Sequence, residues 1–129
     1  MHSVTAQCLF LFLKIIVLGF LAMALHEAGH WIAATAVGVK VKAIGLCWKG
    51  VYLVRESGPP AKNLLISLAG PLMNVALIAV MWQWSHKFGL ANVCFAVCNL
   101  LPIRGSDGDR ALTCWQEMQK ENNPLTENK

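Results

Sequence analysis

Three apolar stretches, separated by polar ones, are the strongest pattern along this chain. They cover residues 4–37, 63–84 and 90–103. The first two are long enough for a helix that crosses the hydrocarbon core, which takes about 20 residues. The third is shorter, so a helix there would stop part-way across a core about 30 Å thick. We therefore expect a mainly α-helical membrane protein with three transmembrane helices.

The stretch between the first two helices has a different period. From Val39 to Gly45 apolar residues alternate with polar or small ones, and a second apolar run follows at residues 51–54. A period of two is typical of β-strands. We predict a small β-hairpin over residues 39–56 that turns near Lys49 and Gly50, and a loop over residues 57–60 because Gly-Pro sequences interrupt a ladder.

Polar groups interrupt the second and third apolar stretches. Gly70-Pro71 should bend or locally open the second helix, because proline lacks an N–H group and its ring clashes with the preceding turn. Pro102 should end the third helix and leave residues 104–109 at membrane depth. Irregular backbone is tolerated there only where it lines a cavity. We expect a metal-ligand turn, a short helix over residues 110–119 and a frayed tail to residue 129.

Composition supports a single membrane domain over residues 1–129. Of these residues 56% are hydrophobic and only 14% are charged, which is too apolar for an ordinary soluble protein. The net charge of +4 does not indicate nucleic-acid binding, because the basic residues form no continuous stripe. The five cysteines are odd in number and lie mostly in apolar surroundings, so we expect packing residues and no disulfide framework.

The motif with the clearest chemistry is His26-Glu27-Ala28-Gly29-His30, inside the first apolar stretch. Positions i and i+4 share one face of a helix, so both imidazoles can reach one metal ion with Glu27 beside them. Ionisable groups are costly at membrane depth, so three in five residues indicate a site. Asp107 could lie at the same depth in the membrane as His26 and His30. A cleaved signal peptide would also begin with an apolar run, but Lys14 interrupts this one and it continues beyond His30.

Basic residues predict the orientation. Five of the eleven lie between residues 40 and 62, whereas the connection between the second and third helices has only Lys87. By the positive-inside rule the hairpin and the C-terminal tail are cytoplasmic, and the N-terminus is outside. The histidine motif and Asp107 then meet in the cytoplasmic half of the membrane.

In these residues the chain resembles the site-2 proteases, which are intramembrane zinc metalloproteases. The resemblance covers nearly the whole chain and rests on His26-Glu27-x-x-His30, Ala69-Gly70-Pro71-x-x-Asn74, and Asn99-Leu100-Leu101-Pro102-Ile103 followed by Asp107-Gly108. The family's third motif usually reads Leu-Asp-Gly-Gly, and this chain has Ser106-Asp107-Gly108-Asp109 instead. That departure leaves Asp109 as a second candidate ligand, with Asp107 favoured by its place in the motif.

The resemblance implies one zinc ion per chain, bound by His26, His30 and Asp107. It implies that Glu27 is catalytic and that Asn74 lies near the active site. The expected activity is hydrolysis of peptide bonds in or near transmembrane segments, with the lipid bilayer and a membrane-protein substrate as partners. No regulatory module is expected within these residues, which leaves that role to a partner protein.

Three alternatives remain open. A non-catalytic zinc protein that holds a partner helix would need a closed four-ligand site, completed by Asp109 or a thiol. An aspartyl protease would need Asp107 and Asp109 to share a proton. A transporter would be expected to show a repeat of the three-helix unit, and the sequence shows none. The hairpin, in turn, could receive an extended substrate at its edge or merely close the cytoplasmic mouth.

Overall fold

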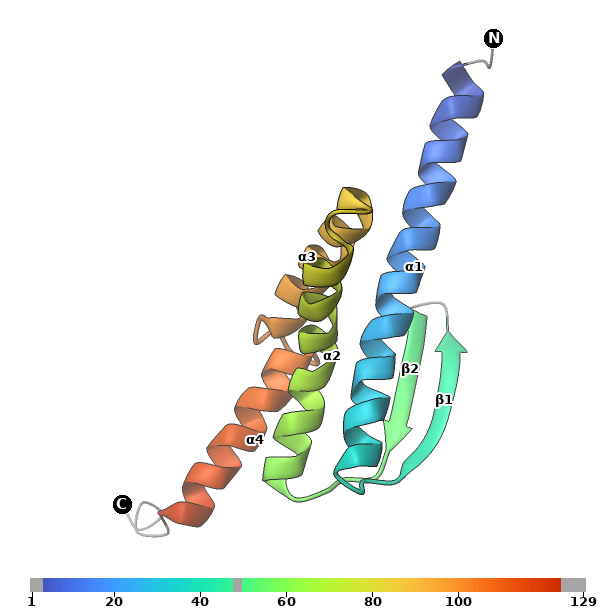
Figure 1. The fold of residues 1–129 in the computed structure, drawn as a ribbon. Coiled ribbons are helices and arrows are strands. Elements are labelled where there is room, and N and C mark those ends of the chain that lie inside the picture. The colour runs from blue at the N-terminus through green and yellow to red at the C-terminus, as the bar shows by residue number, and fades with distance from the viewer. Residues whose placement is uncertain (1–3, 48–49, 124–129) are drawn as a thin grey trace.

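The computed structural model describes residues 4–47 and 50–123. Four helices and one two-stranded hairpin follow in the order α1 (Val4–Ala36), β1 (Val41–Cys47), β2 (Gly50–Arg55), α2 (Pro60–Met81), α3 (His86–Leu100) and α4 (Asp107–Asn122). Helix α2 is central and contacts α1, α3 and α4, while the hairpin packs on α1 (Figure 1). The expected class, mainly helical with a small hairpin, is confirmed.

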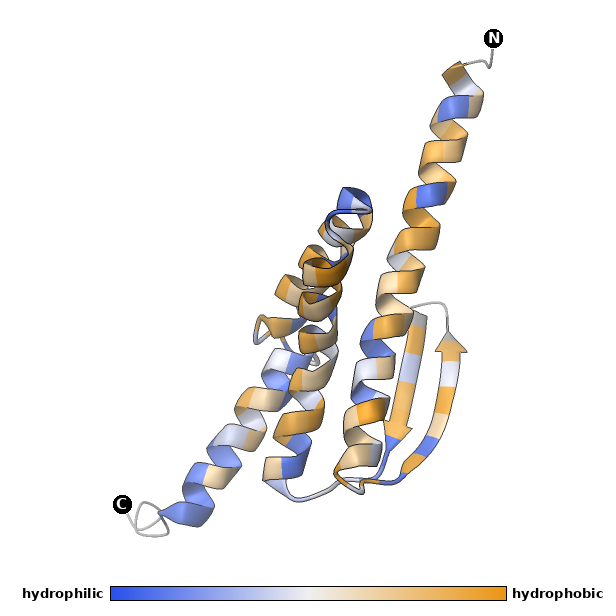
Figure 2. Ribbon diagram, viewed as in Figure 1, coloured by the Kyte–Doolittle hydropathy of each residue, from blue (hydrophilic) through white to orange (hydrophobic). Residues whose placement is uncertain are grey.

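Helix α1 is divided into an exposed half and a packed half. Residues 4–17 are all exposed, and Figure 2 shows that this half is mostly hydrophobic. The buried residues of α1 begin one turn before the histidine motif and recur at helical spacing: Ala22, His26, Gly29, His30 and Ala34. Polar and small residues therefore face the rest of the molecule, and apolar residues face outward, as a lipid environment favours.

Glycine ends α1. Gly38 has φ +74°, and the Val39 N–H donates to the Ala34 carbonyl at 2.8 Å. This reversal is a common C-terminal cap, because glycine adopts the left-handed region without strain. It turns the chain back along α1, where β1 and β2 pair antiparallel with Ile44 opposite Leu53. The predicted turn includes Lys49, which lies outside the described residues.

Helix α2 begins and ends earlier than the apolar pattern predicts. It starts at Pro60 and ends at Met81, where residues 63–84 were expected. Pro60 opens the helix because proline needs no N–H partner in the first turn and its φ suits a helix. The expected opening at Pro71 is not observed, since α2 continues through this residue as one helix. Because Pro71 has no N–H group, the Ser67 carbonyl lacks its usual helical donor.

Helix α3 is also shifted, to residues 86–100 from the expected 90–103. Ser85 caps it by accepting a hydrogen bond from the Phe88 N–H at 3.3 Å, which starts the helix early. With 15 residues, α3 is shorter than a membrane-spanning helix. Among the described residues, α1 and α2 are the two helices long and apolar enough to cross a bilayer.

The expected short helix at residues 110–119 is the longer helix α4, which starts at Asp107 and reaches Asn122. Ser106 caps it, with its Oγ accepting from the Asp109 N–H at 3.1 Å and donating to the Leu101 carbonyl at 2.6 Å. The helix thus includes residues that were expected in the metal-ligand turn and the start of the tail. Residues 124–129 of that tail lie outside the described residues.

Contact between α1 and α2 depends on Gly29. A Cβ atom there would lie 2.7 Å from the Ala69 carbonyl oxygen and 2.9 Å from the Met73 Cβ. Gly29→Ala should therefore lower the free energy of unfolding by about 1–3 kcal/mol through overpacking, measured as a fall in the Tm of the purified protein. Gly19→Ala is the matched control, because Gly19 lies on the same helix with no atom within 4 Å of the added carbon. Equal Tm values for the two variants would contradict this account.

Candidate metal centre

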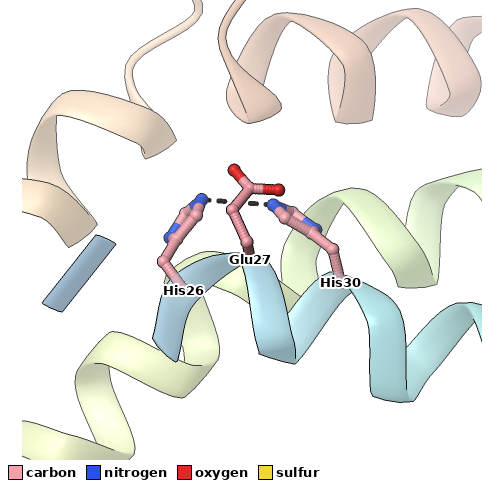
Figure 3. A group of neighbouring side chains, drawn as sticks. All are labelled: His26, Glu27 and His30. Atoms are coloured by element: carbon pink, nitrogen blue, oxygen red, sulfur yellow. Dashed lines mark hydrogen bonds between the residues drawn. The ribbon is translucent and has the colours of Figure 1, made fainter. Parts of the chain in front are cut away.

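His26 and His30 lie one turn apart on the buried face of α1 and point in the same direction (Figure 3). Their Nε2 atoms are 3.1 Å apart, and their rings meet edge to face with centroids 4.8 Å apart. Both side chains are more than nine-tenths buried. The helical spacing thus brings two ring nitrogens to one buried point.

Asp107 reaches the same point from the start of α4. Its Oδ2 atom is 2.9 Å from the His26 Nε2 and 3.1 Å from the His30 Nε2, although 81 positions separate Asp107 from His26. Burial alone would raise the pKa of Asp107, but hydrogen bonding from the His26 imidazole, with the neighbouring His30, outweighs burial and holds this pKa well below its usual range. The Asp107 carboxyl group thus joins the two ring nitrogens at the same buried point.

The hydrogen bond of the His30 Nδ1 determines which ring nitrogen has a lone pair available for a metal ion. Its Nδ1 donates to the Ile66 carbonyl at 2.6 Å, so in the neutral imidazole the Nε2 atom has a lone pair and no proton. Such a bond from the second ring nitrogen is typical of metal-binding histidines. The lone pair faces the His26 Nε2 and the Asp107 carboxylate, which are themselves electron-pair donors.

This donor set fits a zinc ion. Two nitrogens and one carboxylate oxygen are common zinc ligands, and ligands at about 2.0–2.2 Å from a tetrahedral ion are themselves about 3.3 Å apart. The observed separations of 2.9 and 3.1 Å are close to that value. A cation would also relieve the mutual repulsion of these three donors, which hydrogen bonds alone cannot fully satisfy.

Gly70 brings the backbone of α2 directly against the two histidines. A Cβ atom there would lie 2.7 Å from the His26 Nε2 and closer still to the His30 Nε2. Only glycine leaves room for both rings at this distance. The backbone of α2 therefore closes one side of the three-donor cluster.

Glu27 and a cavity lie on an open side. The Glu27 carboxylate is half-buried, projects from α1 on the same side as the two imidazoles (Figure 3), and lies within 4.8 Å of their ligand nitrogens. The cavity has a volume of about 130 Å³, and its lining includes Glu27, His30, Asp107 and Ser67. This is enough room for several water molecules, each of which takes about 30 Å³.

Two other candidate residues have different surroundings. Asp109 accepts a hydrogen bond from the Gly105 N–H at 3.0 Å, so its carboxylate stabilises the turn before α4, while that of Asp107 faces the histidines. Asn74 follows Gly70 by one turn of α2 and is completely buried. Neither its Oδ1 nor its Nδ2 has a hydrogen-bond partner among the described residues, and Asn74 is not among the residues that line the cavity.

The sequence did not single out Ser67, Arg55 or Arg110, all of which line the cavity. Ser67 could have been found, because it precedes Gly70 by three positions and Asn74 by seven, which is one face of a helix. The two arginines lie on β2 and α4, and no local pattern relates them. The thiols of Cys8, Cys94 and Cys98 are exposed, not packed as expected, and that of Cys114 is buried.

Two proteins named as zinc metalloproteases are similar in sequence to this chain. No protein-family profile matches the chain. A Methanocaldococcus jannaschii protein named zinc metalloprotease is 30% identical over 109 residues, which is 74% of this chain and 32% of that protein. A Synechocystis protein, provisionally named a zinc metalloprotease, is 28% identical over 120 residues, 80% of this chain and 32% of that protein. The chain thus spans about a third of the length of these relatives.

A solved structure shares the fold. The site-2 protease from Methanocaldococcus jannaschii superposes with a TM-score of 0.67 at 27% identity, covering 83% of this chain and 54% of that one. The histidine motif of this chain thus lies in a fold shared with a protease of known structure. The chain is therefore similar to this site-2 protease in fold and to zinc metalloproteases in sequence.

The two aspartates of α4 allow a matched test of the metal ligands. Asp107→Asn should weaken zinc affinity by more than about 100-fold, since even a residue that only supports a ligand costs about 10- to 100-fold. Asp109→Asn should keep zinc near one ion per chain, because that side chain bonds to the Gly105 N–H. Zinc content after dialysis against graded chelator measures both. Loss of zinc from Asp109→Asn with retention by Asp107→Asn would reverse the assignment.

Proposed function

We propose that this chain is an intramembrane zinc metalloendopeptidase that hydrolyses peptide bonds in or near transmembrane segments of membrane proteins. The observation that carries the proposal is the meeting of His26, His30 and Asp107 at separations of 2.9–3.1 Å beside Glu27 and an open cavity. His26, His30 and Asp107 would hold one zinc ion. When bound, zinc supplies Lewis-acid polarisation of a peptide carbonyl and lowers the pKa of water to about 7.

Glu27 acts as the general base in this proposal. Its carboxylate faces the cavity in which a water molecule and a peptide carbonyl would meet. It takes a proton from the attacking water and later gives it to the leaving amine nitrogen, so that the peptide bond breaks without a charged amide leaving group. Asp107 cannot replace Glu27 in this role, because its carboxylate is one of the three groups that would hold the zinc ion.

The substrate must reach this cavity as an extended chain, because the carbonyls of a transmembrane helix are engaged in helical hydrogen bonds. Strand β2 pairs with β1 alone among the described residues, so its second edge has no strand partner. Leu53 and Arg55 of β2 also line the cavity. We propose that this edge receives the unwound peptide as an added strand. Closure of the cytoplasmic mouth is the alternative role of the hairpin.

The bilayer placement follows from charge and hydropathy. Helices α1 and α2 are the described helices of spanning length, and α1 has its histidine motif in its C-terminal half. Because basic residues gather in and beside the hairpin, we propose that the hairpin and the C-terminal tail are cytoplasmic and the N-terminus is outside.

The second candidate function is a non-catalytic zinc protein that holds a partner helix. It requires four protein ligands and no room for water. The cavity beside Glu27 and the bond between Asp109 and Gly105 favour the protease. X-ray absorption of the zinc-loaded protein distinguishes them, because a fourth protein ligand would indicate the non-catalytic function.

Glu27→Gln tests the catalytic role. The variant should keep one zinc per chain and lose cleavage of a model transmembrane peptide by about 10²–10⁴-fold, which is the usual contribution of a general base. Glu121→Gln is the control, since it makes the same change at an exposed site near the end of α4. The measurements are zinc content and kcat in detergent. Near-normal cleavage by Glu27→Gln would remove Glu27 from the mechanism.

Asn74 is proposed to hydrogen-bond the substrate backbone near the reacting carbonyl. This requires the cavity to extend toward Asn74 when substrate binds, because Asn74 does not line the cavity in this structure. Its buried amide has both polar atoms without partners among the described residues, and such a group costs free energy unless a ligand or water satisfies it. Asn74→Ala should keep zinc and lower kcat by about 10²-fold, with little change in KM. If kcat stays normal, Asn74 has a structural role instead.

A further inference from the structure

A second and larger hollow adjoins the candidate site. It has a volume of about 510 Å³ and lies between β2 and α4, and four of its residues also line the site cavity: Leu53, Arg55, Ser67 and Arg110. We call these four residues the neck and the larger hollow the outer groove. Because both share the neck, an extended chain could run from the outer groove to Glu27.

The charges along this route are ordered. The neck has two cations, Arg55 and Arg110, and no acidic residue. The acidic residues of the outer groove, Glu56, Asp109 and Glu117, line only that groove. Two of these carboxylates are already engaged, because Asp109 accepts from the Gly105 N–H and Glu56 pairs with Lys42 at 3.7 Å.

The Arg55 guanidinium is fixed by two hydrogen bonds and has further N–H groups that can donate to a ligand. Its Nη1 donates to the Asn63 Oδ1 at 2.6 Å and to the Glu56 carbonyl at 3.3 Å, and within residues 4–47 and 50–123 its other nitrogens make no hydrogen bond. Burial and the nearby charge of Arg110 lower the pKa of the Arg55 guanidinium. Both guanidinium groups line the same small cavity, so an anion that entered it would reduce their mutual repulsion.

Arg110 supplies the second cation. It projects from the first turn of α4, is exposed, and its guanidinium has no hydrogen bond or ion pair among the described side chains. Glu27 and Asp107 line the same cavity as Arg110, but among the described residues neither forms an ion pair with it within 4 Å. A pair of guanidinium groups with free donors is well suited to a carboxylate, which accepts bidentate hydrogen bonds.

We propose that Arg55 and Arg110 bind the carboxylate of an acidic residue in the substrate, so that the enzyme selects peptides with Glu or Asp close to the bond that is cleaved. This inference rests on the proposed function and adds the substrate class to it. The arginines and Glu27 line the same small cavity, and an extended chain advances about 3.3 Å per residue, so the acidic residue lies within about two or three positions of that bond.

The experiment uses the full chain loaded with zinc in detergent and three labelled transmembrane peptides. The peptides differ only in having Glu, Gln or Lys two positions from the cleaved bond. Binding is measured with the Glu27→Gln variant and kcat/KM with the parent protein. The Glu peptide should bind about tenfold more tightly than the Gln peptide, which corresponds to one charge-assisted contact, and should bind best of the three.

The arginine variants identify the residues responsible. Arg110→Gln should remove the preference for Glu, and Arg110→Glu should reverse it in favour of the Lys peptide. A reversed preference cannot result from misfolding, so it separates recognition from stability. Lys120→Gln removes one positive charge from the same helix outside the neck and should keep the tenfold preference.

Equal binding of the Glu and Gln peptides by the parent would overturn the inference, and so would loss of the preference in Lys120→Gln. Competition by anionic lipid without any preference among the peptides would assign the arginines to a headgroup and also overturn it. Cleavage of all three peptides at equal rates would leave the proposed function intact. By contrast, if the zinc-loaded parent protein cleaves none of the peptides, the proposed function is overturned. The role of the arginines is then still tested by the binding of the three peptides.

Discussion

Three electron-pair donors meet inside this molecule, and the fold is arranged around that meeting. The His26 and His30 nitrogens and an Asp107 oxygen lie within 3.1 Å of one another and are almost completely buried. Such groups repel one another and lose hydration, so this arrangement is unfavourable without a cation or shared protons. A metal ion is the simplest group that satisfies all three, which is why the geometry itself points to a metal centre.

Glycine makes this closeness attainable in a small helical protein. A side chain at Gly29 would separate α1 from α2, one at Gly70 would displace the histidines, and one at Gly108 would strike the Leu100 carbonyl. Each of these positions brings backbone against a neighbouring helix or the candidate site. Helices in membranes associate through such small residues, since lipid gives no hydrophobic driving force between them. The same glycines therefore allow the helices to pack closely and the three metal-binding groups to meet.

Polar residues beside the candidate site line two adjoining hollows in a mostly apolar molecule. The path between them runs from the outer groove, past Arg55 and Arg110 at the neck, to Glu27 and the three donors. Polar groups at membrane depth are tolerated where they line a water-filled cavity. If the proposed function holds, the same path would give water and an extended peptide a route to Glu27. One feature would then both hydrate the buried charges and admit the substrate.

The sequence alone determined what depends on local spacing. A repeat of 3.6 residues places His26, Glu27 and His30 on one side of a helix, a repeat of two predicts the hairpin, and Pro102 predicts the break before Asp107. Tertiary structure decided what depends on distant contacts. Asp107 meets His26 across 81 positions, Asp109 bonds to Gly105 instead, and the arginines of β2 and α4 share a neck. No local period encodes these pairings, because they arise only when separate helices and strands pack together.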